Sequence, residues 1–381
     1  MTNQKLRVLI VDDTVVYRRI LSDVIESFDD TELLGTAPHG RLALAKLEHE
    51  PADLVLLDVE MPEMSGLETL RHLRRLYPDT GVIMISGTNS AAAKYTMEAL
   101  ALGALEFVRK PEGSDAEASR AELRDLLRPL LRHVRTRKNL RGIGQNPPAR
   151  PQAGAAPAPA APAPAPPPSP RVAPRPARFD VVGIGVSTGG PNALAEVIPL
   201  LPADLAVPVL LVQHMPPMFT ASLAEHLAKR SAIKVSEAQE GEPVLPGHVY
   251  IAPGGKHMVV RRGGEAATAP FIIGLNENPP ENSCRPSVDV LFRSLAAQFE
   301  GNLLAVIMTG MGSDGCEGVR AMKRRGCHCL SQSEDTCVVY GMPMAVDEAG
   351  LSDEKVPLPR LAARITQLVQ APAHVRTPGG P

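Results

Sequence analysis

The 381-residue sequence contains no tryptophan, and aromatic residues make up only 3% of it. Its five cysteines all lie between Cys284 and Cys337, an odd and clustered set that favours a reducing cytoplasm over a disulfide framework. No apolar run reaches the roughly 18 residues of a membrane-spanning helix. The 40 basic and 42 acidic residues lack the basic excess typical of nucleic-acid binding. The sequence therefore predicts a cytoplasmic protein with no membrane insertion and no nucleic-acid partner.

Proline, in contrast, is abundant and unevenly placed. Residues 147–178 hold 13 of the 38 prolines, mostly alternating with alanine. Such a segment cannot bury a core. It predicts a disordered linker over 141–178 that separates a domain over 1–140 from a second over 179–372, followed by a tail over 373–381. A proline-rich docking site for a partner domain is the alternative interpretation.

The N-terminal 140 residues repeat one pattern five times, a short apolar run followed by an amphipathic helical stretch. The runs are LRVLIV, LLGTA, LVLLDV, VIMIS and EFVRK. This alternation predicts a doubly wound α/β domain, in which helices cover both faces of a parallel sheet. Ligands bind such sheets at the carboxyl ends of the strands.

Polar residues follow those predicted strands, at the end where ligands bind. They are Asp12, Asp13, Asp58, Ser86 and Lys110. Three neighbouring carboxylates repel one another unless a cation lies between them, and Mg²⁺ prefers carboxylates together with phosphate oxygens and water. A carboxylate can also be the nucleophile that forms an aspartyl-phosphate.

This residue set, across the whole segment, resembles the receiver domain of response regulators. The resemblance implies a flavodoxin-like fold in which Asp58 accepts a phosphoryl group whose oxygens Ser86 and Lys110 contact. It also implies that Phe107 stands at the aromatic switch position. The Mg²⁺ ligands that it implies are Asp12, Asp13 and Asp58.

The C-terminal half also alternates strands with helices, which predicts a Rossmann-like three-layer α/β domain with a parallel sheet. The runs DVVGIG, PVLLVQH and LLAVIMT are its predicted buried strands, while HVYIAP, HMVVRR and FIIGL resemble a short antiparallel insertion. Ser187 follows the first strand in GVSTGG, on a glycine-rich turn before a helix, where a nucleophile would be exposed. His214 follows the second strand as its base, and Asp314 follows the third as the residue that orients the base. His257 is a weaker rival base.

The chain order Ser187, His214, Asp314 differs from that of the α/β-hydrolases, in which the acid precedes the histidine. Triads recur in several orders, so the pattern predicts serine chemistry and argues against that particular family. The run GMGSDG, over Gly310–Gly315, also spells a dinucleotide fingerprint and leaves a nucleotide-dependent enzyme as an alternative. A non-catalytic signalling adaptor is the other alternative. The run Cys327-His328-Cys329 lacks typical zinc spacing and predicts buried strand thiols instead.

Six motifs occur in order across this half, namely STGGP, QHMPPMFT, IAPGGKHM, RPSVDVLF, TGMGSDG and VYGMP. They resemble the CheB family of chemotaxis protein-glutamate methylesterases, which has the same succession of receiver, linker and catalytic domain. The resemblance implies that Ser187 is the nucleophile, His214 the general base and Asp314 the acid. It implies that the backbone N–H of Met311 belongs to the oxyanion hole.

The function that this resemblance implies is a phosphorylation-activated esterase. Its substrates would be glutamyl methyl esters on chemoreceptors, with receptor glutamines deamidated in a second activity. A histidine kinase of a chemosensory array would be the phosphodonor. Mg²⁺ would serve receiver phosphorylation, whereas ester hydrolysis would need no cofactor. We expect a monomer in which the unphosphorylated receiver covers the mouth of the active site.

Overall fold

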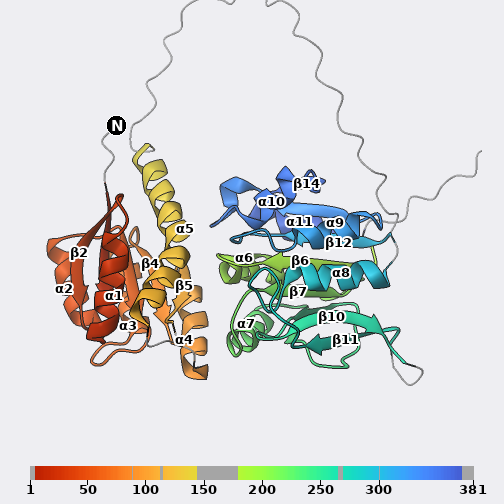
Figure 1. Cartoon of the computed structure of the whole chain (residues 1–381), viewed down its shortest axis with the longest axis horizontal. Helices are drawn as coiled ribbons and strands as arrows, with labels where there is room; N and C mark the ends of the chain where they lie inside the picture. Colours follow the sequence, from red (N-terminus) through yellow and green to blue (C-terminus); the bar gives the residue numbers. More distant parts are fainter. Residues whose placement is uncertain are drawn as a thin grey trace, which may run out of the picture.

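The computed structural model describes residues 5–87, 89–111, 115–143, 179–264, 269–299 and 301–370. Most of the predicted linker, from 144 to 178, and the tail over 373–381 lie outside these residues. The described chain forms two α/β domains that stand side by side, each built on one parallel sheet (Figure 1).

The N-terminal domain contains all five predicted strand–helix units. Its strands are β1 (Leu6–Val11), β2 (Thr31–Ala37), β3 (Leu54–Asp58), β4 (Gly81–Ser86) and β5 (Glu106–Arg109). Its helices are α1 (Val15–Glu26), α2 (Gly40–His49), α3 (Gly66–Leu76), α4 (Ser90–Ala101) and α5 (Ala116–Ile143). The strands are parallel in the order β2-β1-β3-β4-β5, which is the flavodoxin-like order that was predicted. Strands β3 and β4 are fully buried, as expected for a sheet covered on both faces.

The C-terminal domain is built on a seven-stranded parallel sheet. Its strands are β6 (Val181–Val186), β7 (Val209–Gln213), β8 (Lys234–Glu237), β9 (His248–Ile251), β12 (Leu303–Ile307), β13 (His328–Gln332) and β14 (Glu354–Val356). Its α-helices are α6 (Gly190–Val197), α7 (Phe219–Ala228), α8 (Val288–Gln298), α9 (Cys316–Lys323), α10 (Met342–Glu348) and α11 (Leu358–Gln370). Two short 3₁₀ helices, η1 (Ile198–Leu200) and η2 (Glu334–Thr336), complete it. Both predicted α/β architectures are therefore confirmed.

One strand prediction is wrong. The run HVYIAP was expected in an antiparallel insertion, yet β9 pairs in parallel with β7 and β8 in the main sheet. Only β10 (His257–Arg262) and β11 (Phe271–Asn276) form the antiparallel hairpin. Burial explains the difference, because all four residues of β9 are buried, whereas β10 ends in two exposed arginines. A short run buried on both faces is typical of a parallel sheet.

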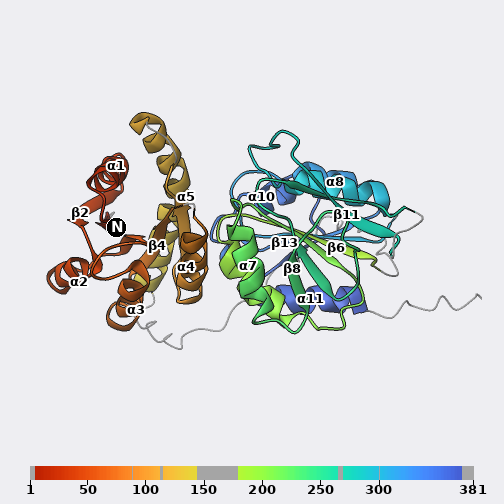
Figure 2. The same cartoon turned by 90° about the horizontal axis from the view of Figure 1, so that it is seen from below.

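The order of the large sheet, β14-β13-β12-β6-β7-β9-β8, determines where a site can form. From β6 the chain moves to β7 on one side, and β12 lies on the other side. The carboxyl ends of β6 and β12 are therefore a topological switch point, where open α/β sheets bind their ligands. This edge faces the N-terminal domain, whose helices α4 and α5 lie opposite it (Figures 1 and 2).

Candidate active site

The acidic residues predicted at the N-terminal sheet edge do lie together. Asp12, Asp13 and Asp58 each place a carboxylate oxygen within 4.8 Å of the others. Lys110 Nζ lies 2.6 Å from Asp58 Oδ2 and 2.8 Å from Asp12 Oδ2. Three carboxylates facing one ammonium group leave excess negative charge. This set of hard oxygen donors therefore suits Mg²⁺.

Burial controls the charge of this cluster. It raises the pKa of Asp58 to about 6, against the opposing effect of the Lys110 ammonium group, while the charges of Asp12 and Asp13 raise it further. Burial also works against the Lys110 charge, but the two carboxylates outweigh it and raise the pKa of the lysine. The cluster is thus held together by a lysine that stays charged.

The predicted phosphoryl contact Ser86 ends β4 at the same edge, but its hydroxyl points to α4. Its Oγ lies 2.8 Å from the Thr96 hydroxyl and donates to the Gly87 carbonyl at 3.3 Å. Phe107, the predicted switch residue, stacks on Phe219 of the C-terminal domain, with ring centroids 5.1 Å apart and an angle of 7° between the planes. The predicted switch residue therefore lies at the contact between the two domains.

Ser187 lies on the tight turn between β6 and α6, at the switch point. Its N–H donates to the Thr309 carbonyl at 3.0 Å, which fixes the turn against the loop after β12. Gly189 has φ +78°, a conformation that glycine adopts without steric cost, and a Cβ there would collide with Val338. The Gln213 amide donates to the Ser187 carbonyl at 2.9 Å. The local sequence thus builds a rigid turn with the serine partly exposed.

His214 follows β7 and meets Asp314 from the loop after β12, as the sequence predicted. Its Nε2 lies 2.8 Å from Asp314 Oδ2. A carboxylate can only accept, so Nε2 carries a proton, and Nδ1 is the nitrogen that takes up and releases the second proton of the ring. Burial opposes a charge on the ring, but the hydrogen bonds to Asp314 and Cys284 outweigh it and raise the pKa of His214 to about 9.

Asp314 is buried, and its two oxygens accept an unusually complete set of hydrogen bonds. Burial favours the neutral carboxyl, yet the His214 hydrogen bond and charge and the Val288 N–H hold the pKa of Asp314 well below its usual range. The further donors are the Asn282 amide, the Ser287 hydroxyl and the backbone N–H groups of Asp289 and Gly315. The acid is therefore fixed in both charge and orientation.

One of these supports, the Asn282 amide, comes from a tight turn over 281–284. Asn282 and Ser283 have φ of +53° and +61°, and Glu281 and Cys284 exchange backbone hydrogen bonds of 3.1 and 2.9 Å. Two successive positive φ values at the centre of a two-residue hairpin define a type I′ turn. It directs the Asn282 amide to both Asp289 and Asp314, each at 2.9 Å. It also places Cys284 Sγ 3.5 Å from His214 Nδ1.

The predicted oxyanion donor Met311 lies on the loop after β12 and lines the same cavity as Ser187. Its backbone N–H donates to no acceptor among the described residues. The preceding Gly310 packs so closely that a Cβ there would lie 2.8 Å from the Ser187 Cβ. This close approach accounts for a glycine at 310. The GMGSDG run therefore brings Met311 to the cavity of Ser187 and Asp314 to His214.

The rival residues have structural roles. His257 is buried, with Nε2 3.1 Å from the Pro279 carbonyl and Nδ1 accepting the Ser287 N–H at 3.2 Å. Cys327 and Cys329 are buried at β13, as the thiol interpretation predicted. The acidic trio at the N-terminal edge is the sole group of metal-ligand type that the described residues form.

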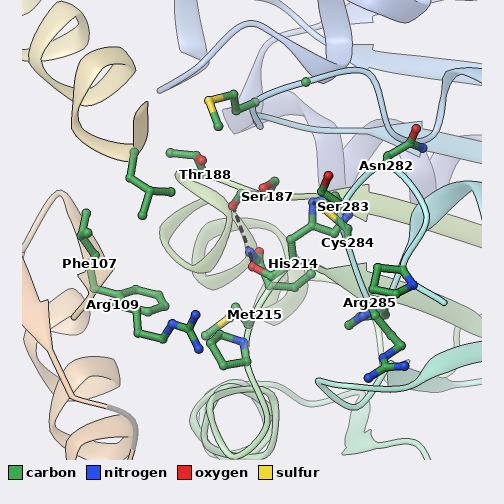
Figure 3. A pocket seen from close by; sticks show the side chains of 18 of the residues that line it. Phe107, Arg109, Ser187, Thr188, His214, Met215, Asn282, Ser283, Cys284 and Arg285 are labelled. Carbon is green, nitrogen blue, oxygen red and sulfur yellow. Dashed lines mark hydrogen bonds between the residues drawn. The ribbon is translucent and has the colours of Figure 1, made fainter. Parts of the chain in front are cut away.

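Both domains line the cavity that contains Ser187, which measures ≈ 850 Å³. Figure 3 shows Ser187 and His214 at its centre, Cys284 and Arg285 on the C-terminal side, and Phe107 approaching from the N-terminal domain. The N-terminal domain thus forms one wall of the cavity.

Sequence reasoning missed the polar contacts that join the domains. Glu106, the first residue of β5, is buried and accepts a hydrogen bond from the Gly189 N–H, two residues after Ser187. The Asn192 amide on α6 donates to the Ala104 and Leu105 carbonyls, each at 3.0 Å. Burial raises the pKa of Glu106 to about 7, opposed by the N–H groups of Gly189 and Phe107.

Comparison with known protein families identifies both halves of the chain. Residues 182–365 match the family described as CheB methylesterase, and residues 8–122 match the response regulator receiver domain. No helix within the described residues is both long and apolar enough to cross a membrane.

Relatives match this chain over nearly its whole length. A protein-glutamate methylesterase/protein-glutamine glutaminase of Desulfotalea psychrophila is 42% identical over 96% of this chain and 99% of its own length. One of Bordetella bronchiseptica with the same name is 41% identical over 95% of this chain and 97% of its own. Among solved structures, the CheB methylesterase catalytic domain of Thermotoga maritima is 39% identical, covering 50% of this chain and 99% of its own, with a TM-score of 0.48.

Proposed function

This chain belongs to the CheB family of receiver-containing methylesterases, and we propose that it is a phosphorylation-activated serine esterase acting on glutamyl methyl esters of chemoreceptors. Relatives that are about 40% identical over nearly the whole chain carry methylesterase and glutaminase in their names. The observation that carries the proposal is the His214–Asp314 pair, with nitrogen and oxygen 2.8 Å apart beside the cavity that Ser187 lines.

The first half of the reaction forms an acyl-enzyme. Ser187 Oγ attacks the ester carbonyl carbon while His214 Nδ1 takes the hydroxyl proton. Asp314 keeps the other ring proton on Nε2 and stabilises the imidazolium ring that forms. The Met311 N–H, which donates to no other described residue, stabilises the developing oxyanion. The His214 proton then passes to the leaving methoxy oxygen, and methanol departs.

The second half of the reaction hydrolyses that intermediate. Water attacks the γ-glutamyl ester of Ser187 with His214 again as the base, which releases the receptor carboxylate and restores the serine. An amide fits the same sequence of steps, with ammonia leaving in place of methanol. Receptor glutamine deamidation is therefore the second activity that we propose for this site.

The domain arrangement corresponds to the resting enzyme. No hydrogen bond within the described residues joins the Ser187 hydroxyl to His214, whose Nδ1 contacts Cys284 instead. The receiver also lines the catalytic cavity and restricts the approach of a receptor helix. Activation therefore requires the receiver to move away and the ring to become available to Ser187.

Phosphorylation provides the signal for that movement. A histidine kinase would transfer its phosphoryl group to Asp58, while Asp12, Asp13 and Asp58 would hold Mg²⁺, which neutralises charge on the phosphoryl oxygens. Lys110 and Ser86 lie at the same strand ends, and the Ser86 hydroxyl must leave Thr96 to reach the phosphoryl group. Movement of Ser86 changes the packing of β4 and α4. Phe107 on the adjacent β5 then transmits the change to the contact with Phe219.

The deciding experiment replaces the serine and follows two readouts. Ser187→Ala should lower methanol release from a methylated receptor by about five to six orders of magnitude, the effect of losing a triad serine. Phosphorylation of Asp58 by a phosphodonor with Mg²⁺ should remain intact. Ser222→Ala, on α7, is the matched control and should keep the esterase activity. Methanol release that survives in Ser187→Ala would refute the assignment.

A further inference from the structure

Cys284 differs from the other four cysteines in its surroundings. Cys316, Cys327, Cys329 and Cys337 are buried, and burial raises the pKa of each thiol, to about 12 for Cys327 and for Cys337. Cys284 is half-buried and lines the catalytic cavity. It is therefore the one cysteine in the described chain that a small soluble reagent can reach.

The partner of Cys284 is a basic nitrogen. Its Sγ lies 3.5 Å from His214 Nδ1, while Asp314 takes the proton on Nε2 at 2.8 Å. Cys284 and Asp314 thus contact opposite nitrogens of the His214 ring. In this arrangement an imidazole can take the proton of a thiol. The type I′ turn over 281–284 fixes this contact. It does so although Ser283 has φ +61°, a left-handed backbone conformation that is unfavourable for serine.

We propose that Cys284 is an oxidisable site for small hydroperoxides, activated by His214 and Asp314, and that its oxidation inhibits the esterase. The link to esterase inhibition rests on the proposed function, whereas the reactivity of the thiol does not. A soft, compact electrophile suits the site, because the cavity is shared between two domains and is open to small molecules.

The reaction balances without any further component. His214 takes the thiol proton through Nδ1, and the thiolate sulfur attacks one oxygen of the hydroperoxide. The S–O bond forms as the O–O bond breaks, so sulfur is oxidised and the peroxide is reduced. The leaving hydroxide, or alkoxide, takes the proton from His214 and departs as water or alcohol. The products are a sulfenic acid at Cys284 and the neutral ring.

Inhibition follows from the position of the new oxygen. It lies between Cys284 and the only ring nitrogen that can accept the Ser187 proton, so the serine loses its base. A sulfenic acid also condenses with low-molecular-weight thiols, and the resulting adduct would fill part of the cavity. Both forms return to the thiol on treatment with dithiothreitol.

The first test measures the thiol itself in the full-length chain. Brief treatment with hydrogen peroxide and dimedone should label Cys284 alone, as located by peptide mass spectrometry. His214→Gln should slow this labelling about tenfold or more. Cys284 should also label faster in the native chain than in the same chain unfolded in urea, where His214 no longer contacts it, which serves if that variant does not fold.

The second test measures esterase activity before and after peroxide treatment. The natural chain should lose most of its methanol release and regain it with dithiothreitol, whereas Cys284→Ser should give the same rate treated and untreated. Equal labelling of all five cysteines, a rate in His214→Gln that matches the natural chain, or peroxide inhibition of Cys284→Ser would each overturn the proposal. If Cys284 labels as expected while Ser187→Ala retains esterase activity, the serine assignment fails and the thiol site stands.

Discussion

Phe107 of the receiver and Phe219 of the catalytic domain stack face to face across the domain contact, with centroids 5.1 Å apart. Phe219 is fully buried at the start of α7, and Phe107 is only partly buried on β5. The switch position predicted in the sequence is thus directly joined to the catalytic domain.

Removing that ring should weaken the resting contact. Aromatic pairs contribute about 0.5–1.5 kcal/mol beyond the area they bury, so Phe107→Ala should raise methanol release without phosphodonor by about two- to tenfold. Phe107→Leu keeps most of the apolar volume and is the matched control, with a smaller increase. An unchanged basal rate in Phe107→Ala would show that the stack does not restrain the enzyme.

Glu106 should make docking depend on pH. Its pKa is about 7 in the docked state, against an ordinary 4.5 once water reaches it, so docking takes up a proton between these values. Docking is therefore strongest below about pH 4.5 and weakens as the pH rises to about 7. Glu106→Gln removes the titration and should keep the domains together at pH 8. Small-angle scattering at pH 5.5 and pH 8 measures this separation directly, and an equal pH response in both proteins would contradict it.

Asn282 should be a positioning residue for the acid of the triad. Its amide bonds both Asp289 and Asp314, and hydrogen bonds to charged groups contribute about 1.5–3 kcal/mol. Asn282→Gly keeps the left-handed backbone and removes only the amide, so kcat should fall by about 10- to 100-fold with little change in KM. The acidic limb of the pH–rate profile should shift as well. Asn278→Ala, on the exposed part of the same loop, is the control, and an unchanged kcat in Asn282→Gly would exclude this role.

Divalent cations should matter only to activation. The acidic trio lies in the receiver, whereas Ser187, His214 and Asp314 offer no comparable oxygen cluster within the described chain. EDTA should abolish the increase in methanol release produced by a phosphodonor and leave the basal rate unchanged, and excess Mg²⁺ should restore the increase. A basal rate that falls with EDTA would mean that ester hydrolysis itself uses a metal.

The sequence predicted the residues at the strand ends because chain order and sheet direction bring them together. Ser187, His214 and Asp314 each follow a buried strand, and parallel strands end at one edge. The turn that supports Asp314 could not be predicted, because the local sequence does not indicate that Ser283 adopts a left-handed backbone conformation. Glu106 was not predicted, because a single glutamate at the start of a strand is usually solvated and its partner here, the Gly189 N–H, belongs to the other domain.

The strand error has a related cause. The run His248–Ile251 is short and apolar, so it fits a hairpin or a central parallel strand equally well. Its position is determined by tertiary pairing with β7, from which it is separated in the sequence by α7 and β8. The local sequence pattern contains no information about such a distant partner.

The contact that Asn192 makes has a consequence for how this enzyme can evolve. Its amide bonds two main-chain carbonyls, those of Ala104 and Leu105, and touches neither side chain through these bonds. Main-chain oxygens are present whatever residue occupies a position, so substitutions at 104 and 105 that leave the backbone in place keep the attachment intact. During evolution the receiver can therefore be exchanged for another domain that has the same loop, and the Asn192 contact of the catalytic domain is kept.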